Sequence, residues 1–503
     1  MQHMNRYLFS TVFITGAAVL ILEVAAVRIL APYYGSSLHV FSSVLTVILA
    51  ALSVGYWYGG KRADTYKSID ELYALIAASG LLVLMLLLVA TTVLPTFGRI
   101  LPVSVGPLFF SFSLFFLPAF LLGIVSPYII KLQSMYTPLE EIGSVVGKTF
   151  FWGTCGSIIG SIASGFYLIP TLGVELSITL VSIVLAGLGV VTPLFLDRPL
   201  QKKWMIGILS LIVIFGSCLY VLTEHRNKQF VYRSDGLYSS ITISDREIYG
   251  QSARLLNRDL NNSSAIFLGN KKLVFDYAQF SKLYKSLKPD ASSMLVLGGG
   301  AYTVPRSIVA TDPDIVVDVV EIEPELYALA QKYFDLSDIS RINNYTQDAR
   351  VFLDRTDKKY DIIFVDLFGT NMAAPFHLTT YEYYALLQEH LTPDGIIMLN
   401  YVGKPKGASP SLTGSLIKTV TAVFPNTRGF MLNPQQPEKF QNIMFLSRNG
   451  TTTIQMPYAI LFESGRTLTT ENMELDLTAY DFATERRLTD DHAPIERLMA
   501  KQR

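Results

Sequence analysis

Seven long apolar runs fill the first 225 residues of this chain and restrict its fold more than any other feature. They are expected near residues 8–30, 40–60, 72–97, 104–132, 148–170, 175–196 and 203–223. An apolar run of about 20 residues is long enough to cross the hydrocarbon core of a bilayer as a helix. The mean hydropathy of +0.36 and the 16% share of charged residues agree with a large membrane-embedded part. Residues 1–225 are therefore predicted to form a multi-span α-helical membrane bundle of about seven helices.

Two charged residues, Glu23 and Arg28, interrupt the first apolar run. Charges inside a span are costly, so they usually face the protein interior and are paired. A mutual structural ion pair is the favoured interpretation. The alternative is a substrate or proton path through the bundle, which would make the protein a transporter.

From about residue 230 the pattern becomes that of a soluble domain. Residues 232–245 alternate between apolar and polar side chains, as a half-buried strand does. A strand pair is expected at 265–268 and 271–275, joined by a turn at Gly269 and Asn270. Residues 226–290 are therefore predicted to form a small β-strand subdomain.

After Pro289 predicted strands alternate with predicted helices. The strands are expected at 294–298, 315–321, 341–346, 360–366 and 395–401, and the helices at 303–311, 324–334, 379–391 and 410–423. This alternation predicts an α/β domain over residues 291–450, with a parallel, doubly wound sheet covered on both faces. Residues 451–503 are expected to form a tail that packs on it.

The strand ends of this domain carry groups that suit a nucleoside, since ligands of such sheets bind beyond the carboxyl ends of the strands. Gly298, Gly299 and Gly300 form a turn that lets the backbone approach a ligand. A carboxylate at the end of the second strand suits the two hydroxyls of a ribose. Glu321 is the candidate, with Glu323 as a less favoured substitute.

Two further strand ends carry aspartates. Asp348 can accept a hydrogen bond from the exocyclic amine of adenine, and the backbone at Ala349 can serve the ring. Capping of the following helix is the alternative for Asp348. Asp366 ends the fourth strand, where the reacting part of the ligand would lie.

Three other segments complete a family pattern: Asp235-Gly-Leu-Tyr238-Ser-Ser-Ile241, Pro375-Phe-His-Leu-Thr-Thr-Tyr-Glu-Tyr-Tyr384 and Leu391-Thr-Pro-Asp-Gly395. With the strand ends, they resemble the spermidine synthase family, the polyamine aminopropyltransferases, over roughly residues 230–450. The layout is similar to that of bacterial membrane proteins in which a multi-span bundle is fused to such a domain.

The resemblance implies an α/β domain of the S-adenosylmethionine-dependent methyltransferase type. It implies decarboxylated or intact S-adenosylmethionine as the donor substrate, and no metal. Glu321 would bind the ribose, Asp348 the adenine, and Asp366 would act as the base. Tyr238, Tyr277 and Tyr302 are expected to contact the substrate.

Several acidic residues of the family pattern are missing. The glycine turn continues with Ala301 instead of an aspartate, Asp366 is followed by Leu-Phe-Gly369 without the second acid, and Tyr277 is followed by Ala278-Gln279 instead of His-Glu. An acid at position 301 would attract the ammonium of a decarboxylated donor and repel the carboxylate of an intact one. Alanine there is expected to remove that repulsion and to make room for the uncleaved methionine group.

Asp490 and Asp491, in the tail, are candidates to replace the missing acidic residues. They are expected either to fold back over the site and restore an acidic wall, or to precede a capped terminal helix near Pro494.

Three functions remain open. The first is a membrane-anchored transferase that moves an aminopropyl-type group to an amine or small nucleophile, or cleaves the donor, and releases methylthioadenosine. The second is a catalytically degenerate nucleoside sensor coupled to the bundle, and the third is a transporter. The formal charge of zero gives no indication of a nucleic-acid partner. The expected partners are the lipid bilayer, a nucleoside and a polyamine.

The charge of the loops conflicts with a cytoplasmic active site. One side of the predicted bundle carries Arg6, Lys61, Arg62, Lys67, Lys131, Lys148, Arg198, Lys202 and Lys203. The positive-inside rule places that side in the cytoplasm. Seven spans would then put the C-terminal domain outside, although sulfonium nucleosides are made inside. An integral protein of a bacterial cytoplasmic membrane is expected, with the side of the soluble domain left open.

Overall fold

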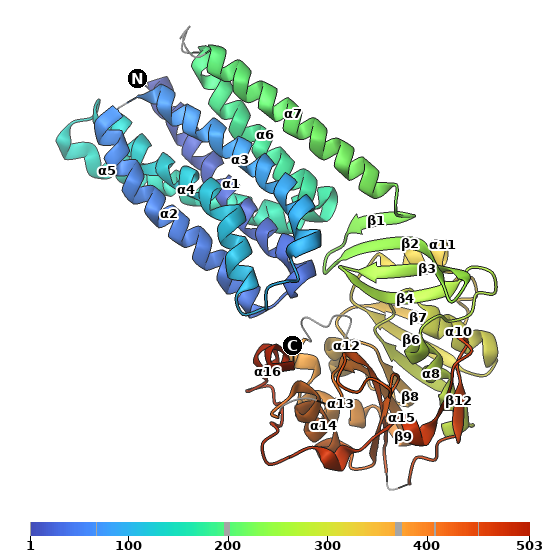
Figure 1. The fold of residues 1–503 in the computed structure, drawn as a ribbon. Coiled ribbons are helices and arrows are strands. Elements are labelled where there is room, and N and C mark those ends of the chain that lie inside the picture. The colour runs from blue at the N-terminus through green and yellow to red at the C-terminus, as the bar shows by residue number, and fades with distance from the viewer. Residues whose placement is uncertain are drawn as a thin grey trace. The chain divides into compact units, whose positions relative to one another are not determined.

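A computed structural model describes residues 2–66, 68–195, 202–367, 375–406, 409–450 and 452–502 (Figure 1). The chain forms two compact units, Met1–Lys228 and Gln229–Arg503.

The first unit is helical. Its described helices are α1 (Gln2–Tyr34), α2 (Leu38–Tyr66), α3 (Ile69–Phe97), α4 (Gly106–Ser134), α5 (Ile142–Ala163), α6 (Ile169–Phe195) and α7 (Lys202–Asn227). Five helical stretches among the described residues are long and apolar enough to span a membrane. The fifth, Ile142–Val190, contains 49 residues and runs from α5 into α6, and the apolar part of α7, Ser210–Glu224, is shorter. Each of the seven expected runs thus overlaps one of the seven described helices, but only five separate stretches of the described residues are long and apolar enough to span a membrane.

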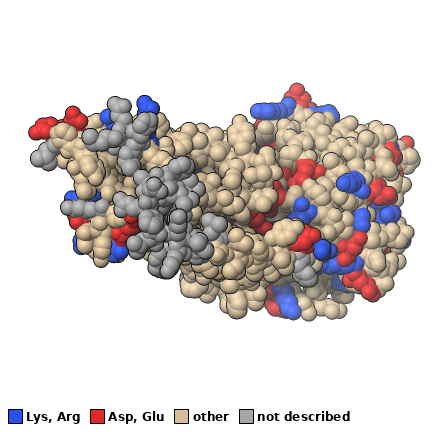
Figure 2. Space-filling view, turned by 90° about the horizontal axis from the view of Figure 1, so that it is seen from above, with Lys and Arg blue, Asp and Glu red and all other residues tan. Residues whose placement is uncertain are grey.

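Charged side chains are unevenly distributed between the units. On the face shown in Figure 2, Lys, Arg, Asp and Glu are scattered over the α/β unit, whereas much of the helical unit has neither sign of charge. Such a surface is typical of helices that contact lipid rather than water.

Small residues bring α1 and α5 into close contact. A side chain at Gly156 would collide with the backbone of Phe13, and one at Gly160 with the backbone of Ala17. Ser157 also donates a hydrogen bond to the carbonyl of Gly16 (3.1 Å). Glycine at these positions therefore allows two apolar helices to approach backbone to backbone, as small residues do in membrane bundles.

The second unit begins with a four-stranded antiparallel sheet in the order β1 (Tyr232–Asp235), β2 (Ser240–Ile248), β3 (Gln251–Arg258) and β4 (Asn261–Phe267). A turn closed by a hydrogen bond from Gly236 N to Ser239 O (3.0 Å) splits the strand predicted over 232–245. Residues 271–275 form no second strand, because Leu273 makes only an isolated bridge to Ile266.

The main sheet has eight strands in the order β14-β10-β11-β9-β8-β5-β6-β7. These are β5 (Ser293–Leu297), β6 (Val316–Glu321), β7 (Ile342–Thr346), β8 (Tyr360–Val365), β9 (Leu391–Gly403), β10 (Thr427–Met431), β11 (Gln441–Arg448) and β14 (Glu474–Leu475). The pairs from β7 to β9 are parallel, as predicted, but β11 runs antiparallel to β9 and β10, and β14 runs antiparallel to β10. The prediction of a parallel sheet is therefore wrong for this edge. The loop 432–440 between β10 and β11 is too short for the crossover that parallel neighbours require.

Helices cover both faces of this sheet. They include α8 (Asp276–Phe280), α10 (Thr303–Thr311), α11 (Leu326–Tyr333), α12 (Ala349–Arg355), α13 (Tyr381–Glu389), α14 (Leu412–Val423) and α16 (Ile495–Gln502). Alternate residues of β5 enter separate apolar cores: Leu295 and Leu297 pack with α13 and α14, while Met294 and Val296 pack with α8 and α10. Because the strands are fixed from both sides, their carboxyl ends form one rigid edge.

Candidate active site

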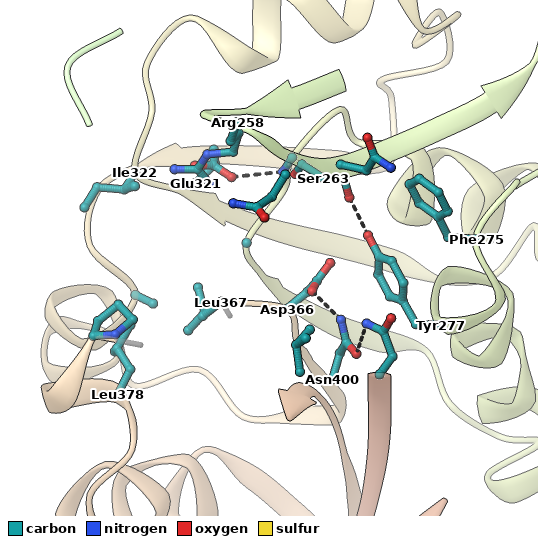
Figure 3. A pocket seen from close by; sticks show the side chains of 18 of the residues that line it. Arg258, Ser263, Phe275, Tyr277, Glu321, Ile322, Asp366, Leu367, Leu378 and Asn400 are labelled. Atoms are coloured by element: carbon teal, nitrogen blue, oxygen red, sulfur yellow. Dashed lines mark hydrogen bonds and ion pairs between the residues drawn. The ribbon is translucent and has the colours of Figure 1, made fainter. Parts of the chain in front are cut away.

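A cavity of about 840 Å³ opens at the carboxyl ends of β5, β6, β7 and β8 and continues beside β9 and β11. Figure 3 shows Glu321 and Arg258 together at one part of it, Asp366 near its centre, and Tyr277 and Asn400 beyond Asp366. The cavity thus contains the strand ends that the sequence analysis singled out.

Glu321 ends β6 and is held in a fixed position by backbone donors. Its Oε2 accepts a hydrogen bond from Gly300 N (2.9 Å) and its Oε1 accepts one from Glu323 N (3.0 Å). Arg258 Nη1 lies 3.7 Å from Glu321 Oε1. The side chain is only 3% exposed, yet it lines the cavity. A carboxylate has about four lone-pair positions, so two remain for the hydroxyls of a ribose.

Glu323, the substitute considered for this role, points elsewhere. Its carboxylate accepts hydrogen bonds from Leu237 N (3.0 Å) and Tyr238 N (2.9 Å), in the turn between β1 and β2. It is not among the cavity residues. Glu323 therefore attaches the small sheet to the main one.

The glycine turn follows β5 as expected. Gly298 and Gly300 line the cavity. Gly298 has φ 93°, and a side chain there would collide with the backbone carbonyl of Asp366. Gly299 lies behind the turn, where a Cβ would be 3.0 Å from the ring of Tyr302 and from Val319. Glycine is thus required because the backbone of the turn passes directly against the end of β8.

The two residues after the turn do not face the cavity. Ala301 is 2% exposed, packs in the apolar core beneath the small sheet, and donates its N–H to Ser264 Oγ (3.1 Å). Tyr302 is fully buried, its hydroxyl bonds to Asn344, and its ring lies 5.2 Å from that of Tyr327. The position of Tyr302 does not support the expected substrate contact, and alanine at position 301 does not enlarge the cavity.

Asp348 is placed to fill both of the roles predicted from the sequence, the cap of a helix and the acceptor for adenine. Its Oδ1 caps α12 by accepting hydrogen bonds from Arg350 N (2.9 Å) and Val351 N (3.1 Å). Its Oδ2 faces His377 Nε2 at 3.3 Å. The hydrogen bond with His377 and those from the helix N–H groups outweigh burial and lower the pKa of Asp348. Asp348 and Ala349 both line the cavity, so an ionised acceptor stands where an adenine amine is expected.

Asp366 follows β8 and combines burial with hydrogen bonding. Burial raises the pKa of Asp366 to about 6, although the hydrogen bond from Asn400 opposes this rise. Asn400 Nδ2 donates to Asp366 Oδ1 (2.8 Å), and Asn442 Nδ2 donates to Asn400 Oδ1 (2.9 Å). The two amides orient the carboxylate, and a pKa near neutrality suits a group that accepts a proton.

Tyr277 and Tyr238 both line the cavity, as expected for substrate-contacting residues. The Tyr277 hydroxyl donates to the carbonyl of Ser263 (2.5 Å), and burial raises the pKa of Tyr277 well above its usual value. Tyr277 therefore keeps its proton and can only position neighbouring groups. Tyr238 is 51% exposed at the rim.

The two aspartates of the tail lie away from the cavity. Asp490 forms an ion pair with Arg350 (2.5 Å) and accepts a hydrogen bond from Thr380 Oγ1 (2.7 Å). Asp491 is exposed and, like Asp490, does not line the cavity. An acidic wall made by these residues is not seen. Asp490 instead fastens the tail to α12 and α13.

Some cavity residues were not predicted from the sequence. They are Arg258, Asp276, His377, Asn400 and Arg466. His377 lies inside a segment that was recognised, and Asp276 directly precedes Tyr277, so both could have been found by asking which polar residues flank the family segments. Arg466 carries no local signal, because only the folding of the tail brings it to the cavity.

In the helical unit, Glu23 and Arg28 both lie on α1 and are both partly buried. Their ion pair stays a prediction. In the part of the chain that the structure describes, no group of three or more His, Cys, Asp or Glu side chains is arranged to hold a metal.

Known proteins are similar to large parts of this chain. Residues 278–455 match the family model described as the spermine/spermidine synthase domain. This part of the chain is therefore similar to a spermine/spermidine synthase domain. The helices that precede it are consistent with a membrane domain. The expected architecture, a helical bundle followed by an α/β domain, is confirmed, with the sheet mixed rather than parallel.

Several curated proteins are similar to the chain. A "Probable polyamine aminopropyl transferase" of Bifidobacterium longum is 25% identical over 265 residues, which cover 52% of this chain and 57% of that protein. An "N-terminal histidine N-methyltransferase" of Emericella nidulans is 34% identical over 179 residues, covering 33% of this chain and 30% of that protein. "Polyamine aminopropyltransferase 1" of Streptomyces coelicolor is 24% identical over 474 residues, covering 88% of this chain and 84% of that protein. The last alignment is too long to lie within the second unit alone.

A solved structure, a probable spermidine synthase from Corynebacterium glutamicum, is also similar. It has 23% sequence identity and a TM-score of 0.40, and the match covers 44% of this chain and 81% of that one.

Proposed function

We propose that this protein is a membrane-anchored transferase that moves an aminopropyl-type alkyl group from an adenosyl sulfonium donor to an amine and releases methylthioadenosine. The observation that carries the proposal is one cavity that holds Glu321, Asp348 and Asp366 at the carboxyl edge of the sheet. A sensor would need only the first two. The third has an environment that suits proton transfer.

The donor is decarboxylated or intact S-adenosylmethionine. Its ribose hydroxyls donate to the remaining lone pairs of Glu321, and the exocyclic amine of its adenine donates to Asp348. Ile322, Leu367 and Leu378 line the same end of the cavity and supply apolar surface for the flat ring (Figure 3). In this proposal the sulfonium lies between the glycine turn and Asp366.

The transfer is a direct displacement at carbon. The lone pair of a neutral amine nitrogen forms a bond to the carbon next to the sulfonium, the carbon–sulfur bond breaks, and its electron pair neutralises the sulfur. The nitrogen then carries an extra proton, which passes to the carboxylate of Asp366. Asn400 holds that carboxylate toward the cavity, so that positioning and proton acceptance supply the catalysis.

The helical unit is assigned to the membrane in this proposal. Its support is the five apolar helical stretches and the largely uncharged part of the helical unit on the face shown in Figure 2. The boundaries 1–225, 226–290, 291–450 and 451–503 are proposed for the bundle, the small sheet, the nucleoside-binding domain and the tail.

Product analysis tests the function. Purified full-length protein is incubated with decarboxylated or intact S-adenosylmethionine together with an amine, and the nucleoside products are separated by mass spectrometry. Methylthioadenosine formed by the wild type and lost in Asp366→Asn supports the proposal. S-adenosylhomocysteine would indicate methyl transfer instead, and donor binding without any product would indicate a sensor.

A further inference from the structure

The cavity has a second charged pair beyond Asp366. Asp276, the first residue of α8, and Arg466, in the tail, both line this part. Arg466 Nη1 donates to Asp276 Oδ2 (2.8 Å), and Arg466 Nη2 donates to the carbonyl of Leu432 (3.1 Å). The Asp276 side chain is 12% exposed and that of Arg466 is 40% exposed. A cation therefore stands inside the part of the cavity that is left for the acceptor.

The charges of this region do not suit a dication. The carboxylate of Asp276 is balanced by Arg466, and burial raises the pKa of Asp366. The other polar residues that line this region include the uncharged side chains of Tyr277, Asn400, Asn433, Gln441 and Asn442. A diamine with two ammonium groups would meet one unbalanced carboxylate and a repelling guanidinium.

Arg466 retains capacity for an anion. A guanidinium has five N–H donors in a planar fork, and within the described residues Arg466 uses two of them. The remaining donors match a carboxylate, the partner that arginine binds best. Asp276, directly beside it, can accept from an ammonium group. The pair thus offers one site of each sign, and the bonded atoms Arg466 Nη1 and Asp276 Oδ2 lie 2.8 Å apart.

We propose that the acceptor is a diamino acid rather than a simple diamine. Its carboxylate binds Arg466, its α-ammonium binds Asp276, and its terminal amine reaches Asp366 and attacks the donor. This inference rests on the proposed function and specifies the substrate of the same site. As in the displacement described above, the nitrogen of the terminal amine forms the new bond to carbon and then releases one proton to Asp366.

Ornithine and putrescine form a matched pair of probes, since they differ by one carboxylate. Each is titrated calorimetrically into full-length protein saturated with methylthioadenosine, so that no turnover is needed. We expect the wild type to bind ornithine about 10-fold or more tightly than putrescine, the ratio that corresponds to about 1.4 kcal/mol. Arg466→Gln should weaken ornithine by a similar factor and leave putrescine unchanged or tighter, because a repelling charge is removed.

Arg428→Gln is the control. Arg428 forms a comparable two-bond pair with Glu474 (both 2.7 Å), but it does not line the cavity, so neither ligand should change. Unchanged affinity for methylthioadenosine shows that each variant is folded at the site. If the wild type binds putrescine as tightly as ornithine, the inference is wrong whatever the variants do. If methylthioadenosine itself does not bind to the wild type, the proposed function is wrong, and the inference about the acceptor is wrong with it.

Discussion

Replacing Asp366 with asparagine should stabilise the sheet and at the same time abolish catalysis. Burial raises the pKa of Asp366 from 3.8 to about 6. A carboxyl group with a raised pKa in the folded state favours folding while it is protonated, and this advantage is lost as the pH rises from about 4 to about 6. Two pKa units correspond to about 3 kcal/mol at most, since each unit is worth about 1.36 kcal/mol.

The asparagine side chain has the same shape and no charge. It can still accept the hydrogen bond that Asn400 Nδ2 donates to Asp366 Oδ1 at 2.8 Å. Asp366→Asn should therefore increase the stability of β5 and β8 by up to about 3 kcal/mol at pH 8 and by little at pH 4. Hydrogen exchange of peptides from these strands in the full-length protein, corrected for intrinsic rates at each pH, measures the opening free energy.

Asp361→Asn is the matched control on the same strand. Burial opposes ionisation of Asp361, but hydrogen bonds from Ser292, Ser293 and Thr392 outweigh it and lower the pKa of Asp361. The ionised form is therefore the stabilising one, and Asp361→Asn should destabilise β8 by about 1–3 kcal/mol at pH 8, less as the pH falls. If both variants lower protection equally at pH 8, the account of Asp366 is refuted.

Three further predictions follow from the site and the bundle. The rate of transfer should decrease as the pH falls below about 6, because the protonated Asp366 accepts no proton, whereas a pH-independent rate down to pH 5 would remove it as the base. Glu321→Gln should weaken methylthioadenosine binding by about 10- to 100-fold in calorimetry, since two hydrogen bonds to a charged acceptor are weakened; unchanged affinity would exclude a ribose contact. Gly156→Leu should separate α1 from α5 and lower the thermal stability of the detergent-solubilised protein, whereas Gly165→Leu, where a side chain meets open space, should not.

The sequence predicted the strand ends well, because each is a local pattern. An apolar run that stops at a glycine turn or at a carboxylate identifies Gly298, Glu321 and Asp366 without knowledge of the fold. The antiparallel edge was missed because β10 and β11 follow the last predicted helix and have no helix between them.

The directions in which side chains point were harder to predict from the sequence. Tyr302 and Glu323 lie next to cavity residues in the sequence, yet both face other parts of the protein. Their directions depend on the turn between β1 and β2 and on the packing of α10 and α11, which no local pattern encodes. Arg466 is the opposite case, since a tail residue far from any family segment reaches the cavity by tertiary contact with Asp276.

The central claim is that a nucleoside bound at Glu321 and Asp348 presents a sulfonium carbon to an amine beside Asp366. The most direct test is to incubate the full-length protein with decarboxylated S-adenosylmethionine and an amine labelled with nitrogen-15, and to identify both products by mass spectrometry. The account predicts methylthioadenosine and a labelled amine heavier by one aminopropyl group, formed in equal amounts and absent with Asp366→Asn. Equal product formation by wild type and Asp366→Asn, or donor binding with no product from the wild type, would contradict it.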